Sequence, residues 1–110
     1  MGLDIYILTD LPEQHVPRQY QNYLDFGIKG WWLVPYVRTF GNFKDGCGSI
    51  NISNYLKVSV PSWETVEEYV KGEYPNDYSR IWTKEDHESF IAALKYFATN
   101  DFDSYLQYDC

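Results

Sequence analysis

Residues 83–99 read TKEDHESFIAALKYFAT, and this stretch has the strongest helical pattern of the chain. Thr83 followed three positions later by Asp86 is the pattern of a capping box, in which both side chains cover free backbone N–H groups at a helix start. The pattern predicts a helix from Lys84 to about Thr99. Its buried stripe, at spacings of three and four, is expected to contain His87, Phe90, Ile91, Leu94, Phe97 and Ala98.

Three further helices are predicted around this one. Pro61 and Ser62 open a helix that Gly72 closes, with Ser62 as its N-cap. The inner face of that helix is expected to hold Trp63, Val66, Tyr69 and Val70. A short last helix is predicted over Phe102–Tyr108 after an Asp101 cap, and an early one from Pro17 to about Phe26, ended by Gly27.

Alternating or β-branched stretches predict the strands. They are Leu3–Thr9, Trp31–Phe40 (an edge strand because of Pro35), Ser49–Ser53 and Tyr55–Val60. Strands that come mostly before helices are typical of an α+β fold. We therefore expect a small antiparallel sheet with the C-terminal helices packed on one face. The length of 110 residues predicts a single compact domain over residues 1–110.

The composition excludes several classes of protein. With 45% hydrophobic and 19% aromatic residues, the chain is not a disordered acidic tail. Its 16 acidic and 9 basic residues give a net charge of −7, which argues against direct binding of nucleic acid. No apolar run is long enough for a membrane span, and no secretory signal is visible. Together with only two cysteines, this predicts a cytoplasmic protein.

The acidic charge is segregated along the chain. Residues 1–63 hold five acidic and five basic side chains, whereas residues 64–110 hold eleven acidic and four basic ones. The entire net charge therefore lies in the helical second half. Such a surface would attract a basic partner and accelerate its association. The simpler interpretation is a solvated helical surface with carboxylates placed to suit the helix dipoles.

Aromatic residues accompany this acidic half. Eleven Tyr and four Trp are many for a chain of this length, and such side chains are favoured at the centres of protein interfaces. The alternative is that half of these rings belong to the core. The candidate partner-binding residues are Glu67, Glu68, Tyr74, Asp77, Tyr78, Trp82, Glu85, Glu88, Asp101 and Asp103.

Motifs for catalysis or metal binding are weak. The segment Gly41–Ser49 surrounds Cys47 with glycines, which would leave a thiol accessible beside Lys44, but turn chemistry also explains this composition. His87 lies between two acidic residues, yet neighbouring helix positions point in different directions, so a core histidine is the simpler interpretation. We expect no catalytic residue, no metal and no cofactor.

The first residues, MGLDIYI at positions 1–7, resemble the start of many small bacteriophage and mobile-element proteins. The resemblance ends by Thr9 and implies a phage or prophage setting. It carries no site residue with it. Small acidic phage proteins commonly inhibit host defence proteins, some of them by imitating nucleic acid.

These observations predict a non-enzymatic, acidic, phage-type interaction protein that inhibits a host defence protein by covering a basic surface. In this setting the protein would act in the host cytoplasm, on a basic host protein. One alternative is an immunity protein that neutralises a toxin. Another is a small-molecule or nucleotide binder, with a pocket lined by Trp31, Trp32 and Tyr36 near the Cys47 loop.

Overall fold

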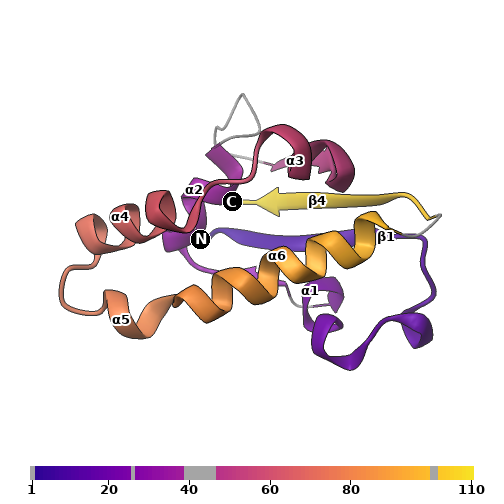
Figure 1. Cartoon of the computed structure of the whole chain (residues 1–110), viewed down its shortest axis with the longest axis horizontal. Coiled ribbons are helices and arrows are strands. Elements are labelled where there is room, and N and C mark those ends of the chain that lie inside the picture. The colour runs from indigo at the N-terminus through magenta and orange to yellow at the C-terminus, as the bar shows by residue number, and fades with distance from the viewer. Residues whose placement is uncertain (1, 26, 39–46, 100–101) are drawn as a thin grey trace.

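A four-stranded antiparallel sheet with helices on one side forms the protein (Figure 1). The computed structural model describes residues 2–25, 27–38, 47–99 and 102–110. The strand order is β2-β1-β4-β3. The strands are β1 (Asp4–Thr9), β2 (Ile28–Lys29), β3 (Cys47–Asn51) and β4 (Ser104–Asp109). The predicted α+β class, with helices packed on one face of a small antiparallel sheet, is confirmed.

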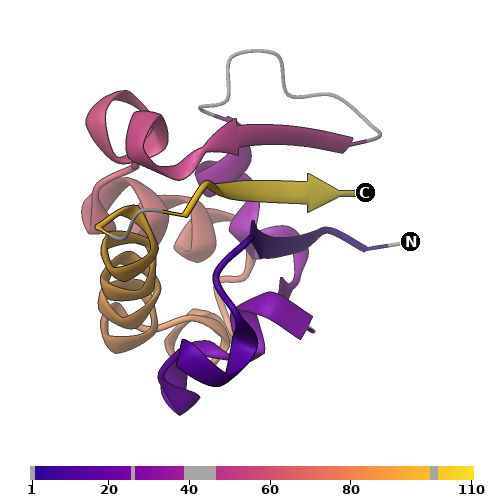
Figure 2. The ribbon, with the colours of Figure 1, turned by 90° about the vertical axis from the view of Figure 1, so that its right-hand side faces the viewer.

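The two ends of the chain form the middle of this sheet. Strands β1 and β4 pair along their whole length, from Asp4 opposite Asp109 to Thr9 opposite Ser104. Successive side chains of a strand point to opposite faces, so one face of the pair carries the buried residues and the other faces outward. The buried face of the two strands consists of Ile5, Ile7, Ser104, Leu106 and Tyr108. Helices α4 and α6 lie on this side of the sheet (Figure 2).

Six α-helices and three short 3₁₀ helices connect and cover the described strands. The α-helices are α1 (Asn22–Asp25), α2 (Val34–Arg38), α3 (Ile52–Val58), α4 (Trp63–Glu73), α5 (Tyr78–Ile81) and α6 (Lys84–Ala98). The 3₁₀ helices span Glu13–His15, Arg18–Tyr20 and Trp31–Leu33. None of the helices described here is long and apolar enough to cross a membrane.

The two long helices form where their caps predict them. The Ser62 hydroxyl accepts from the backbone N–H of Thr65 at the start of α4. At the start of α6 the Thr83 hydroxyl accepts from the N–H of Asp86 at 3.2 Å, and the Asp86 carboxylate accepts from the N–H of Thr83 at 2.9 Å. The capping box is therefore confirmed. The buried residues of α6 are His87, Phe90, Ala93, Leu94 and Phe97, while Ile91 and Ala98 are half-buried at the edge of the core.

Two stretches predicted as strands are helical. In Trp31–Phe40, the described residues form a 3₁₀ turn followed by α2, and Pro35 occupies the first turn of α2, where a helix needs no N–H donor. Most of Tyr55–Val60 lies in α3, which the side chain of Asn51 caps by accepting from the N–H of Asn54. In both stretches, burial of the helix against the core outweighs the β propensity of the residues.

The predicted helix over Phe102–Tyr108 is wrong, because Ser104–Asp109 forms strand β4. Buried and exposed residues alternate along it, which is the period of a strand. Its predicted cap, Asp101, lies outside the described residues. The early helix predicted from Pro17 is split into a 3₁₀ turn and the short helix α1. Gly27 follows α1 with a φ of +63°, and a Cβ there would collide with the backbone of β1.

Candidate functional site

The start of α6 is held in place by a buried hydrogen-bond network. The indole N–H of Trp82 donates to the Tyr36 hydroxyl oxygen at 2.8 Å, and this oxygen lies 2.7 Å from Nδ1 of His87. The Tyr55 hydroxyl donates to the backbone carbonyl of Tyr36 at 2.7 Å. Since Tyr36 comes from α2 and His87 from α6, these bonds lock the two helices together.

The donors fix where the protons lie in this network. An indole N–H can only donate, so the Tyr36 oxygen is an acceptor for Trp82. Burial raises the pKa of Tyr36 far above its usual value, so the hydroxyl keeps its hydrogen and is able to donate it to Nδ1 of His87. When it does so, the proton of neutral His87 lies on Nε2.

His87 also shows that α4 and α6 bring carboxylates together. Burial lowers the pKa of His87, while Glu88 on its own helix and Glu64 on α4 act in the opposite direction. The Trp63 ring, at the first position of α4, lies 5.7 Å from the His87 ring. The beginnings of the two helices are thus neighbours, and acidic residues of both act electrostatically on the same histidine.

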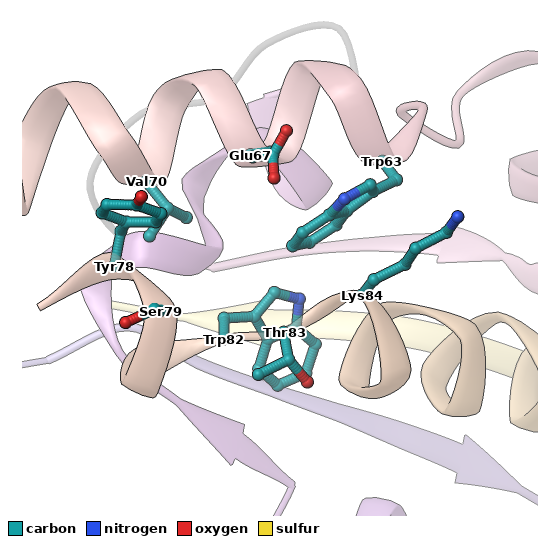
Figure 3. Close-up of a pocket in the computed structure, with 8 residues that line it drawn as sticks. All are labelled: Trp63, Glu67, Val70, Tyr78, Ser79, Trp82, Thr83 and Lys84. Carbon is teal, nitrogen blue, oxygen red and sulfur yellow. The ribbon is translucent and has the colours of Figure 1, made fainter.

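An open cavity of about 280 Å³ lies beside this network, where α4, α5 and the start of α6 meet. Figure 3 shows the rings of Trp63, Tyr78 and Trp82 on different sides of the space, with Glu67 extending from α4. The complete set of described lining residues is Trp63, Glu67, Val70, Tyr78, Ser79, Trp82, Thr83 and Lys84. Glu67 is the only carboxylate in that set.

A cation of the protein itself contacts two of these lining residues. The Nζ atom of Lys71 lies 3.8 Å from a carboxylate oxygen of Glu67, one helical turn away. The same atom lies 5.2 Å from the centroid of the Tyr78 ring, within the range of a cation–π interaction. Both charged side chains are well exposed, so solvent weakens the ion pair and it can exchange.

The structure brings together only part of the predicted partner-binding set. Glu67, Tyr78 and Trp82 line the cavity. Trp82 is not an exposed anchor as expected, because it is 9% exposed and its N–H is used inside the core. Glu68, Glu85 and Glu88 are exposed on α4 and α6.

The other members of the set have different surroundings. Asp77 pairs with Arg80 at 2.7 Å, one turn along α5. Tyr74 is half-buried and packs edge-on against Trp32, with ring centroids 6.0 Å apart. Asp103 is exposed just before β4, beside Asp10 at the end of the sheet, and Asp101 lies outside the described residues.

Sequence reasoning missed the cavity although one signal for it was present. Trp63, Glu67 and Val70 are separated by four and three residues, so they share one face of α4. An acidic side chain inside an otherwise apolar stripe is unusual, because a charge is costly to bury. Such a position indicates an opening beside the stripe, which the structure shows to be the cavity.

The structure describes the rival sites only in part. Tyr36 is fully buried, so it cannot line a ligand pocket with Trp31 and Trp32. Most of the glycine-rich segment, residues 41–46, lies outside the described residues; Cys47 is an exposed thiol at the start of β3. Among the described residues, no cluster of three or more His, Cys, Asp and Glu side chains is arranged to hold a metal ion.

Comparison of the chain with protein-family models, with curated proteins and with solved structures found no match. Two features of the structure are relevant: the acidic first turns of α4 and α6, which are neighbours at Trp63 and His87, and the cavity lined by aromatic rings.

Proposed function

We propose that this protein binds a basic surface of another protein through an acidic face on α4 and the first two turns of α6. This acidic face is defined as Glu64, Glu67, Glu68, Glu85 and Glu88. The observation that carries the proposal is that the acidic first turns of α4 and α6 are neighbours, with the Trp63 ring 5.7 Å from the His87 ring. Carboxylates on a single helix are accounted for by contact with water. Two neighbouring acidic helices, in contrast, create a wide negative surface that can bind a basic partner.

Hydrogen bonds and ion pairs support the distinction between this face and other acidic residues. Asp86 is engaged in the capping box and Asp77 pairs with Arg80, so both are accounted for by the fold. On the sheet, Asp4 has Lys29 within 4.0 Å. Within the acidic face, Glu64, Glu68, Glu85 and Glu88 are exposed, and Glu67, which has an exposed ion pair with Lys71, lines the cavity.

The expected partner follows from charge and from the resemblance of the first residues. Complementary charge speeds association and selects a partner rich in Lys and Arg. The resemblance to phage proteins makes a host protein the expected target. If the covered surface is one that normally contacts nucleic acid, binding would inhibit the target by competition, because phosphates bind the same cations.

The proposal is tested by reversing charge at two places on the molecule. Glu68→Lys/Glu88→Lys changes the acidic face, and Asp103→Lys/Asp109→Lys makes the same change in charge on the β4 side. The partner is captured from a bacterial lysate, identified by mass spectrometry, purified and titrated against each variant by calorimetry. We expect the first variant to weaken binding at least tenfold, since like charges across an interface repel.

The control variant should retain affinity within about threefold. Binding of the unmodified protein should also weaken steeply between about 0.05 and 0.5 M salt, because exposed charges are screened over roughly 8 Å near physiological ionic strength. Equal losses in the two variants, or affinity that is indifferent to salt, would refute the role of the acidic face.

A further inference from the structure

We infer that the cavity between α4, α5 and α6 is a subsite for an arginine side chain of the basic partner; this inference rests on the proposed function. The cavity presents three aromatic rings, Trp63, Tyr78 and Trp82. A guanidinium group stacks on aromatic faces and is more weakly hydrated than an ammonium group. Aromatic walls therefore favour arginine over other charged side chains.

Glu67 supplies the matching negative charge. It lies on α4 between Trp63 and Val70 and lines the cavity, and its side chain is 40% exposed, so an incoming group can reach it (Figure 3). A carboxylate can accept two parallel N–H bonds from one guanidinium, which fixes its orientation as well as its charge. Lys84 lines the opposite side but extends away from Tyr78 (Figure 3).

Lys71 indicates that a cation is stable at this position. Its ammonium group contacts both the Glu67 carboxylate and the Tyr78 ring in the protein alone. An arginine from the partner would take over the carboxylate, and Lys71 would turn out to solvent. Lys71 then acts as a competitor for the subsite, and its removal should increase the affinity for arginine.

The size of the cavity favours a side chain over a nucleotide. Small-molecule sites usually measure roughly 300–1,000 Å³, and this cavity, at about 280 Å³, falls just below that range. A nucleotide would also bring phosphate charges next to Glu67, which would repel them. A single guanidinium with part of its aliphatic chain fits the volume of the cavity and carries the positive charge that Glu67 attracts.

The test uses small probes in place of the partner. N-acetyl-arginine methylamide is titrated into the ¹⁵N-labelled protein, and the assigned indole N–H resonances of Trp63 and Trp82 are followed by NMR. The neutral analogue N-acetyl-citrulline methylamide has nearly the same shape, and N-acetyl-lysine methylamide has the charge without the planar fork. We expect saturable shifts in the millimolar range with arginine, weaker ones with lysine and none with citrulline.

Three variants separate the contacts. Glu67→Gln should weaken arginine binding at least tenfold, because hydrogen bonds to a charged group are among the strongest. Its matched control is Glu68→Gln, which loses the same charge one position away and outside the cavity lining, and should change affinity less than twofold. Lys71→Ala should strengthen binding about two- to fivefold, the size of effect that an exposed ion pair has.

The outcomes distinguish this inference from the proposed function. No indole shift, equal binding of citrulline, tighter binding of lysine, or a Glu68→Gln loss equal to that of Glu67→Gln would overturn the arginine subsite. If the subsite fails while the charge-reversal experiment still separates the two faces, the proposed function stands without it. If arginine binds as expected but no partner discriminates the two faces, the subsite stands and the proposed function falls.

Discussion

Trp82 separates two regions of the molecule that are built from the same kinds of residue and behave differently. On one side, Tyr36 and His87 join its indole in a closed hydrogen-bond network inside the core. On the other, its ring meets Trp63 and Tyr78 across an open cavity. Aromatic side chains with polar ends therefore pack into the core in the first region and line an open cavity in the second.

The largest effect is expected from removing the central hydroxyl of the closed network. Tyr36→Phe leaves the Trp82 N–H and Nδ1 of His87 without this partner, and each unsatisfied buried group costs about 1–3 kcal/mol. We expect the free energy of unfolding in guanidinium chloride to fall by about 2–4 kcal/mol. The control is Tyr105→Phe on the outer face of the sheet, which should change it by less than about 0.5 kcal/mol. Similar losses in both variants would show that the network does not hold the helices.

A smaller loss of stability is expected when the pH is lowered, because His87 of the closed network then takes up a proton. Burial lowers the pKa of His87 below its unfolded value of 6.5, with Glu88 and Glu64 opposing the shift. The unfolded chain then binds a proton more readily than the folded one, so stability from this group is complete above about pH 6.5 and declines as the pH falls below it. Urea unfolding from pH 7.5 to 5.0 measures the decline.

Two histidine variants locate this pH dependence. His87→Gln should flatten the part of the curve below pH 6.5, since Gln offers an acceptor to Tyr36 but does not titrate. His15→Gln, which replaces an exposed histidine of the 3₁₀ turn Glu13–His15, should keep the decline. A decline that survives in His87→Gln would place its origin in other groups.

Thr83 connects the two regions, because it lines the cavity and caps the helix that carries His87. Thr83→Ala removes the cap and should lower the free energy of unfolding by about 1 kcal/mol. Ser89→Ala, at an exposed position of the same helix, should have almost no effect or stabilise slightly, as Ala favours helices. Thermal unfolding followed by circular dichroism compares the two variants; a Thr83→Ala protein as stable as Ser89→Ala would show that the cap contributes nothing.

The smallest effect on stability is expected in the open cavity. Glu67→Gln loses the exposed ion pair with Lys71, and such pairs contribute between about 0 and 1 kcal/mol. We expect chemical unfolding to show a change of less than about 0.5 kcal/mol. A loss of more than 2 kcal/mol would mean that Glu67 supports the fold and that its role is not recognition.

The elements that the sequence predicted correctly are those whose signals are local. Thr83 and Asp86 cap α6, and Ser62 caps α4, within three residues of the groups they satisfy. The stretch around Trp31 was misread because its β propensity is a weak preference that core packing overrides. Strand β4 alternates in burial along Ser104–Asp109. Its partners β1 and β3 are distant in sequence, so the residues around β4 do not indicate which strands it pairs with.

In the candidate site, too, the features with local sequence signals were predicted and those that depend on distant contacts were not. Glu67 and Tyr78 were predicted as recognition residues from charge and aromatic content, and both line the cavity. That Trp63 meets them there depends on how α4 lies against the start of α6, which is set by contacts between helices. Trp82 was expected at the surface, but its N–H bond to Tyr36, 46 positions away, draws it into the core.

The pairing of β1 with β4 has a consequence for biosynthesis. Strand β1 pairs with β4, which lies about 100 positions downstream in the sequence. Strand β3, on the other side of β4, needs the same partner. While the ribosome still holds residues 104–109, the sheet lacks its central ladder and the apolar side of β1 is uncovered. The sheet is completed by closure of one long loop, which makes its formation slow for a chain of this length. Until β4 is available, β1 depends on holding chaperones or on the helices α4 and α6 to cover its apolar side.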